Sequence, residues 1–218
     1  MILSRTSFDK QREEMVRTQL AERGIRDLRV LEAMRSVPRH EFVPEELRDR
    51  GYEDCPLPIG EGQTISQPYI VAAMLEHLAL AATDRVLEVG TGSGYVTALL
   101  SVLCASVFSV ERHGALAEGA RAALARLGCN NVAIRVGDGS VGWSEAAPFD
   151  AVVVSAATAE VPAALFEQLR EGGRLIAPVG PAWEQELQLV RKVGGKPAVA
   201  RLEGCRFVPL VRGEVDSG

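Results

Sequence analysis

The stretch Glu88-Val89-Gly90-Thr91-Gly92-Ser93-Gly94 decides the fold, because three glycines separate an apolar run from a helical pattern. Residues 85–89 form the apolar run, and residues 95–104 have the spacing of a helix with one buried face. Glycines at a strand-to-helix turn allow a tight main-chain path and leave room for a ligand. The stretch therefore predicts a site for a nucleoside-type cofactor. Its spacing is G-x-G-x-G, without the last glycine of the dinucleotide pattern G-x-G-x-x-G, which disfavours NAD.

The chain around this turn alternates between the two kinds of pattern. Strands are expected at 85–89, 107–110, 132–136 and 151–154, and helices at 95–104, 115–127 and 161–169. Strands separated by helices of this length predict a parallel sheet that is covered on both faces. After Gly172-Gly173 we expect three closing strands, with at least one antiparallel pair, at 174–179, 186–190 and 206–210. The fold class predicted is a doubly wound α/β fold of Rossmann-like type, with a mostly parallel sheet and an antiparallel C-terminal portion.

The residues before this core predict an N-terminal helical cap and a loop. Helices are expected at 8–23, ended by Gly24, and at 27–34. Residues 52–66 are rich in proline and glycine and predict a loop, followed by a helix at 67–80 with Ser66 as its N-cap. We expect a single domain over 1–218, with the cap and substrate loop at 1–80, the cofactor-binding core at 81–180 and closing strands at 181–218.

Composition narrows the class of protein. A content of 47% hydrophobic and 24% charged residues is typical of a globular protein, and no apolar run reaches the roughly 18 residues of a membrane span. The formal net charge is −5, and the basic residues are scattered, which disfavours nucleic acid as a partner. The cysteines and histidines lack metal-ligand spacing, and no secretory signal is recognised. We expect a cytoplasmic monomer with reduced thiols, no metal, and no nucleic-acid or membrane partner.

Acidic residues near the expected strand ends suggest which cofactor binds. Glu111 ends the strand after the glycine turn, where a carboxylate can accept hydrogen bonds from both ribose hydroxyls. Asp138, at the end of the next strand, is expected to bind the adenine amino group. Glu88 would repel a pyrophosphate but suits the cationic amino-acid end of S-adenosylmethionine. This pattern favours S-adenosylmethionine, while a different cofactor, or a tight turn with incidental surface acids, remains open.

The loop Ile59-Gly60-Glu61-Gly62-Gln63-Thr64-Ile65-Ser66-Gln67-Pro68-Tyr69 is the most specific part of the sequence. It closely resembles the signature of the protein-L-isoaspartate O-methyltransferases. Further motifs resemble the same family in matching order, at 37–44, 52–58, 86–95, 136–139, 149–157, 172–175 and 207–210. The resemblance covers nearly the whole chain, from about residue 10 to residue 210.

The resemblance implies a protein-repair reaction. The family transfers the methyl group of S-adenosylmethionine to the free α-carboxylate of an L-isoaspartyl residue in a damaged protein, which gives a methyl ester and S-adenosylhomocysteine. The ester then collapses to a succinimide, from which a normal aspartyl linkage can form. A carboxylate has a pKa near 4 and is already a nucleophile at neutral pH, so this transferase needs no strong general base.

Site residues carry over from the resemblance position by position. The serine of the loop, Ser66, is implied to be the catalytic residue that positions the substrate carboxylate, with the N-cap as its competing or additional role. The cofactor-binding residues expected are Thr64, Ile65, Glu88, Gly90, Thr91, Gly92, Gly94, Glu111, Arg112, Asp138 and Gly139. Substrate contacts are expected from Ser66, Ser155, Val208 and Leu210, of which Ser155 stands where the family often has threonine. Val208 and Leu210 also suit ordinary core packing, and cofactor contacts from 211–218 are unassigned.

Three other functions remain open from the residues alone. One is a methyltransferase with the same cofactor turn and a small-molecule acceptor. Another is a non-catalytic protein that binds the cofactor for regulation, and the third is an NAD-dependent oxidoreductase. Each differs from the repair enzyme in its response to paired peptides that contain aspartate or isoaspartate.

Overall fold

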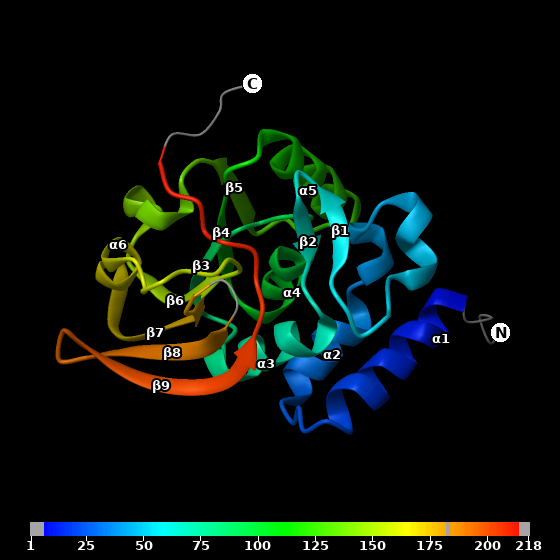
Figure 1. Ribbon diagram of the computed structural model, residues 1–218, viewed down its shortest axis with the longest axis horizontal. Coiled ribbons are helices and arrows are strands. Elements are labelled where there is room, and N and C mark those ends of the chain that lie inside the picture. The colour runs from blue at the N-terminus through cyan, green and yellow to red at the C-terminus, as the bar shows by residue number, and fades with distance from the viewer. Residues whose placement is uncertain (1–6, 182–183, 214–218) are drawn as a thin grey trace.

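The computed structural model describes residues 7–181 and 184–213 (Figure 1). Its centre is a seven-stranded sheet of order β5-β4-β3-β6-β7-β8-β9. The strands are β3 (Arg85–Val89), β4 (Ser106–Glu111), β5 (Val132–Val136), β6 (Phe149–Val154), β7 (Leu169–Val179), β8 (Gln185–Val193) and β9 (Lys196–Cys205). The first five in the sheet order pair in parallel, whereas β8 and β9 are antiparallel to their neighbours. The predicted fold class is confirmed.

Both faces of the sheet are covered. Successive strand residues point to opposite faces, so Val86 and Leu87 of β3 enter two different cores. The Val86 face packs against α3 (Pro68–Leu78), α4 (Tyr95–Leu103) and α5 (Gly114–Arg126). The Leu87 face packs against α6 (Ala163–Glu167) and Trp143, which lies between the short 3₁₀ helices η4 (Gly139–Val141) and η5 (Ser144–Ala146). This is the doubly wound arrangement that the alternating pattern predicts.

The N-terminal cap extends the first of these cores. α1 (Ser7–Glu14) continues as the π-helix η1 (Met15–Ala21), and Gly24, with φ of +107°, follows it. α2 (Leu28–Ser36) begins after Asp27, whose side chain accepts hydrogen bonds from the amides of the first turn. Two 3₁₀ helices follow, η2 (Arg39–Phe42) and η3 (Glu45–Arg50). Apolar side chains of η1, α2 and η2 join α3 and α4 in one continuous core.

The predicted loop at 52–66 contains regular structure, which corrects the sequence-based expectation. β1 (Leu57–Gly60) and β2 (Gln63–Ile65) form a two-stranded antiparallel hairpin. Its turn has positive φ at three successive residues, Gly60, Glu61 and Gly62, so the glycines mark a hairpin turn. The N-cap of α3 is Gln67 instead of Ser66, with Pro68 as the first helical residue.

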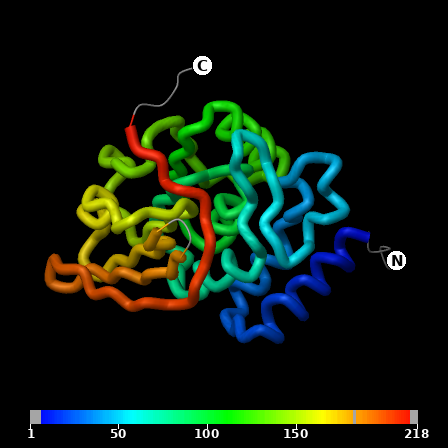
Figure 2. Tube along the Cα trace, in the orientation of Figure 1, coloured from blue at the N-terminus to red at the C-terminus, as the bar shows by residue number. Residues whose placement is uncertain are grey.

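The last closing strand also differs from the prediction. β9 occupies 196–205, joined to β8 through a Gly194-Gly195 turn, and the predicted strand at 206–210 is wrong. β9 is a mostly exposed edge strand, so its sequence lacks the alternation of a half-buried strand. Residues 206–213, here called the C-terminal strap, leave the sheet and run back across the molecule (Figure 2). Main-chain bonds of 2.7 Å join Ala157 to Val208 and to Leu210 and hold the strap after β6.

Candidate active site

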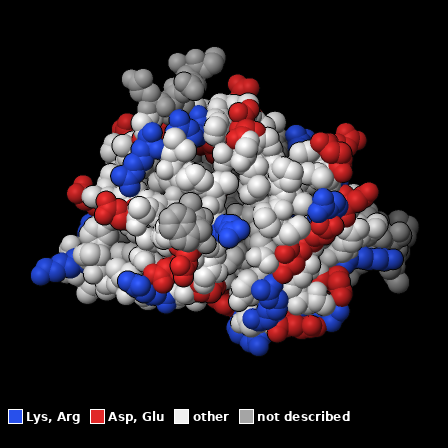
Figure 3. All heavy atoms as spheres, viewed as in Figure 1, with Lys and Arg blue, Asp and Glu red and all other residues white. Residues whose placement is uncertain are grey.

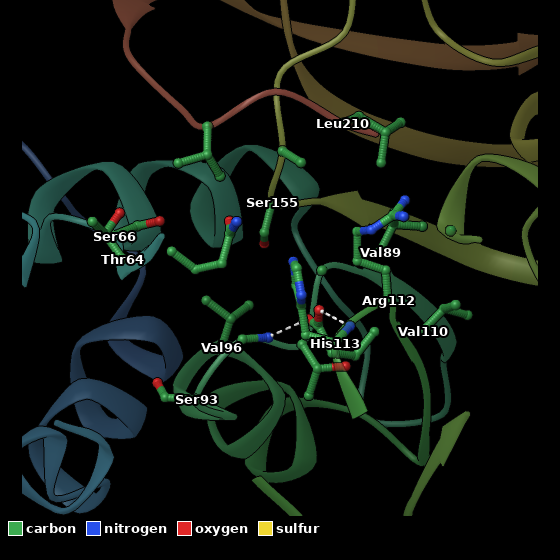
Figure 4. Close-up of a pocket in the computed structure, with 18 of the residues that line it drawn as sticks. Thr64, Ser66, Val89, Ser93, Val96, Val110, Arg112, His113, Ser155 and Leu210 are labelled. Atoms are coloured by element: carbon green, nitrogen blue, oxygen red, sulfur yellow. Dashed lines mark hydrogen bonds between the residues drawn. The ribbon is translucent and has the colours of Figure 1, made fainter. Parts of the chain in front are cut away.

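A cavity lies at the carboxyl ends of β3, β4 and β6, the edge at which open α/β sheets bind ligands (Figure 4). Six segments form its wall: the β2 end of the hairpin, the glycine turn, the loop after β4, the loop after β5, the end of β6 and the C-terminal strap. Twelve of the predicted site residues line it: Thr64, Ile65, Ser66, Gly90, Thr91, Gly92, Glu111, Arg112, Gly139, Ser155, Val208 and Leu210. Tertiary folding thus brings together residues that lie up to 146 positions apart.

Glu111 connects the glycine turn to the loop after β4. Its carboxylate accepts a 2.8 Å hydrogen bond from the Gly92 amide and a 2.9 Å bond from the His113 amide. Only 4% of Glu111 is exposed, so these bonds fix the carboxylate at the cavity wall. Each carboxylate oxygen can accept a further hydrogen bond. A ribose diol suits this acceptor pair, and the residues present therefore fit a nucleoside cofactor.

Glu88 supports the glycine turn from behind the cavity wall, whereas the sequence led us to expect a direct cofactor contact. Its Oε2 accepts hydrogen bonds of 2.6 Å from both the Thr97 and the Ser109 hydroxyl, and Oε1 has no partner among the described residues. Ser109 in turn lies 2.6 Å from the hydroxyl of Thr91, which does line the cavity. Burial raises the pKa of Glu88 to about 7, although the two hydroxyl donors act in the opposite direction.

Gly94 and Asp138 also have contacts other than those expected. A Cβ at Gly94 would lie 3.2 Å from the Cβ of Ala120, so this glycine lets α4 and α5 approach each other. The Asp138 carboxylate accepts hydrogen bonds from the amides of Ser140, at 2.8 Å, and Gly213, at 2.7 Å. Burial opposes ionisation, but these bonds hold the pKa of Asp138 below its usual value. The residue predicted to bind adenine thus anchors the C-terminal strap.

The acceptor side of the cavity carries hydroxyl groups and apolar strap residues. Thr64 and Ser66 approach from the end of β2, and Ser155 follows β6 (Figure 4). Ser66 is half-buried, and helix α3 does not use its side chain as a cap. Leu210 of the strap lies on the other side of Ser155 in the same view. Hydroxyl donors therefore stand beside an apolar wall, an arrangement suited to a carboxylate on a peptide.

Two covers close over this cavity. Ile59 of the hairpin reaches the glycine turn, because its Cδ1 lies only 3.2 Å from where a Cβ of Gly92 would stand. Glu61, at the hairpin turn, lies 3.8 Å from Nδ1 of His113 in the loop after β4. On the other side, Arg112 donates a 2.9 Å hydrogen bond to the carbonyl oxygen of Val211 in the strap. The hairpin and the strap together restrict solvent access to the cavity.

Several wall residues were not predicted from the sequence: Gln63, Val89, Ser93, Tyr95, Val96, Val110, His113, Ala156, Pro209 and Val211. Most are chain neighbours of predicted residues, so extending each motif by one or two positions identifies them. Val211 directly follows the predicted Leu210, and it reaches the site because the strap leaves the sheet. In the described part of the chain, no group of three His, Cys, Asp or Glu residues is placed to hold a metal ion.

Comparison with known proteins agrees with this geometry. Residues 10–215 match the sequence model of the family described as protein-L-isoaspartate(D-aspartate) O-methyltransferase. The chain belongs to this family. A protein-L-isoaspartate O-methyltransferase of Methanoculleus marisnigri is 55% identical over 93% of this chain and 92% of its own length. One from Methylorubrum extorquens is 56% identical over 93% of this chain and 89% of its own length.

Solved structures of protein-L-isoaspartate O-methyltransferases have the same fold. One superposes with a TM-score of 0.84 at 32% identity, covering 94% of this chain and 67% of the other. A crystal structure from Plasmodium falciparum, described as such an enzyme in complex with S-adenosyl-L-homocysteine, has a TM-score of 0.81 at 28% identity. That match covers 96% of this chain and 100% of the other chain. The family assignment therefore rests on sequence and on architecture.

Proposed function

We propose that this methyltransferase transfers the methyl group of S-adenosylmethionine to the α-carboxylate of L-isoaspartyl residues in damaged proteins, and so initiates their repair. The observation that carries the proposal is the shared cavity of Glu111 and Ser66. It joins a carboxylate suited to a ribose diol with a hydroxyl suited to a substrate carboxylate. Membership of the family supplies the reaction that connects these two halves.

The cofactor would be held by the glycine turn and by the loops that follow β4 and β5. Glu111 accepts hydrogen bonds from the ribose hydroxyls, and the main chain of Gly90 to Gly92 leaves space for the amino-acid end of the cofactor. Gly139 lines the cavity wall after β5. Glu88 stabilises the turn through Ser109 and Thr91. When bound, S-adenosylmethionine supplies an electrophilic methyl group on a sulfonium.

The protein's contribution to the reaction is orientation and exclusion of water. The Ser66 hydroxyl donates a hydrogen bond to one oxygen of the substrate carboxylate and leaves the other oxygen as the nucleophile. Ser155 is a further hydroxyl donor in the cavity wall. Val208 and Leu210 of the strap contact the peptide around the isoaspartyl residue. Because the carboxylate is ionised at neutral pH, no side chain has to remove a proton, and the closed cavity limits solvation of the nucleophile.

A pair of peptides tests this function. The protein is incubated with labelled S-adenosylmethionine and two peptides that differ only in an aspartyl or an isoaspartyl linkage. We expect base-labile methyl ester on the isoaspartyl peptide only. Equal labelling of both peptides, or of neither, would contradict the proposal. Labelling of a metabolite in place of either peptide would favour a small-molecule acceptor.

We also propose a cytoplasmic, monomeric enzyme without a nucleic-acid or membrane partner. Cys55, Cys104, Cys129 and Cys205 are free thiols, as suits a reducing compartment. Lys and Arg side chains are scattered among Asp and Glu on the face shown in Figure 3, without the continuous basic stripe of a nucleic-acid site. None of the helices in the described ranges is long and apolar enough to span a membrane. Light scattering tests the monomer, and a dimer would contradict it.

A further inference from the structure

Arg39 is a fully buried cation next to the wall of the active site. It begins η2 and has no exposed surface. Its Nε donates a 2.8 Å hydrogen bond to the Gly51 carbonyl, and Nη2 donates to the Cys55 carbonyl at 3.4 Å. Its guanidinium carbon lies 5.0 Å from the centre of the Tyr95 ring. Tyr95 also lines the cavity, so a single residue contacts both this charge and the site.

No carboxylate neutralises this charge by contact. Within residues 7–181 and 184–213, no Asp or Glu oxygen lies within 4.0 Å of a nitrogen of Arg39, and Nη1 has no hydrogen-bond partner there. Asp54, an acidic group that acts on Arg39 from a distance, is paired with Arg23 at 2.6 Å. Carbonyl groups and an aromatic face satisfy donors but do not cancel a full charge. Burial lowers the pKa of Arg39, yet a guanidinium stays protonated at neutral pH.

An unneutralised charge in a medium of low polarity acts over a longer distance than one in water. The ligand proposed for the acceptor side is an anion, the α-carboxylate held by Ser66. Arg112, an arginine that lines the cavity, lies across it from Ser66 (Figure 4) and donates a hydrogen bond to Val211 of the strap. Arg39 contacts the ring of Tyr95 and donates hydrogen bonds to the carbonyls of Gly51 and Cys55, in the segment that precedes the hairpin. Its position therefore allows it to make the acceptor side attractive to negative charge.

We propose that Arg39 determines acceptor specificity: its buried charge favours an anionic carboxylate over a neutral group of the same shape at the acceptor site. This inference rests on the proposed function, because it takes the isoaspartyl carboxylate as the acceptor. Arg39 does not touch the substrate. It acts through the potential that it creates behind Tyr95.

The alternative explanation is a purely structural role, in which the hydrogen bonds of Arg39 hold the chain near Ser66 and its charge has no effect on binding. Arg39 holds the carbonyls of Gly51 and Cys55, and between them the Asp54 carbonyl accepts a 3.2 Å hydrogen bond from Gln67, the neighbour of Ser66. Loss of the side chain would thus disturb the acceptor serine even if its charge were irrelevant. Such a disturbance weakens the binding of anionic and neutral ligands alike, whereas loss of the charge weakens the binding of the anionic ligand only.

The experiment measures peptide binding by calorimetry in the presence of S-adenosylhomocysteine, so it does not depend on turnover. Two ligands are compared: an isoaspartyl peptide and the same peptide with its isoaspartyl α-carboxylate replaced by a carboxamide. The variant is Arg39→Met, which removes the charge. Arg29→Met is the control, because Arg29 also donates to two main-chain carbonyls, Leu80 and Leu103, but is exposed and does not line the cavity.

We expect the wild type to prefer the carboxylate peptide, and Arg39→Met to lose about tenfold of that preference, as expected for one charge acting through a low-polarity wall. Arg29→Met should retain it. Equal weakening of both peptides by Arg39→Met, or an unchanged preference, would overturn the proposal. If Arg39→Met does not fold, Arg39→Gln makes the same comparison. Turnover of the aspartyl and isoaspartyl peptide pair by the wild type tests the proposed function separately.

Discussion

The cofactor side and the acceptor side of the cavity are built in different ways. On the cofactor side, Glu111 binds the amide of Gly92, only 19 residues earlier. On the acceptor side, the strap is held by Arg112 and Asp138, which lie 99 and 75 residues before their partners Val211 and Gly213. Consecutive βα units therefore form one half of the site, whereas the hairpin and the strap reach it only when the whole chain has folded. The cofactor half should accordingly depend on a few charged side chains, and the acceptor half on many weaker contacts.

Replacement of Glu111 should have the largest effect. Glu111→Ala should weaken binding of S-adenosylhomocysteine about 1000-fold, from the loss of two charged hydrogen bonds at about 2 kcal/mol each. Calorimetry measures the affinity, and Glu118→Ala, at an exposed position of α5, serves as the control. Wild-type affinity in Glu111→Ala would mean that the ribose lies elsewhere and would remove the main support for the cofactor half.

Glu88 tests whether the turn is supported by a buried acid. Its pKa in the folded protein is about 7, above the ordinary value of 4.5. The favourable contribution of its protonated form is thus complete below pH 4.5 and is lost as the pH rises through 7. Relative to Glu88→Gln, the wild type should lose up to about 3 kcal/mol of unfolding free energy between these limits. Urea unfolding of both proteins at pH 5 and pH 8 measures the change, and parallel pH profiles would show that Glu88 ionises normally.

Replacement of Ser66, on the acceptor side, should affect turnover and not cofactor affinity. Ser66→Ala should lower kcat/KM for an isoaspartyl peptide about 30-fold, which corresponds to the loss of one hydrogen bond to a charged group, about 2 kcal/mol. Affinity for S-adenosylhomocysteine should stay within twofold of the wild type. Ser93→Ala, on the glycine-turn side of the cavity, is the matched control. Unchanged turnover in Ser66→Ala would withdraw its positioning role.

The strap should show the smallest effect. Asp138→Ala removes the acceptor of the Gly213 amide, and it should weaken S-adenosylhomocysteine binding about fivefold, or about 1 kcal/mol, through a looser cover. Hydrogen exchange at the Gly213 amide should become faster in the same variant. Loss of affinity with unchanged exchange at Gly213 would instead indicate a direct contact between Asp138 and the cofactor.

Local pattern was sufficient for much of the core. β3 and β5 have the predicted bounds, α4 ends one residue earlier than predicted, and α5 begins and ends one residue earlier. Buried parallel strands have continuous apolar sequences, and few residues other than glycine adopt the main-chain conformations of the turn between β3 and α4. For the same reason Glu111, the last residue of a buried strand, could be assigned to the cavity. The edge strand β9 could not be predicted, because the sequence of an exposed strand lacks a continuous apolar run.

The sequence by itself thus determined the doubly wound sheet, the glycine turn and the carboxylate that faces it, since each depends on residues close together in the chain. Only the tertiary structure decided that Glu88 is buried behind the turn, that Asp138 binds the strap and that residues 206–213 cover the cavity. The direction of a side chain and the path of an irregular segment depend on packing between distant elements. The charge of Arg39 is visible in the sequence, but its burial beside Tyr95 without a carboxylate partner in the described chain is a property of the fold.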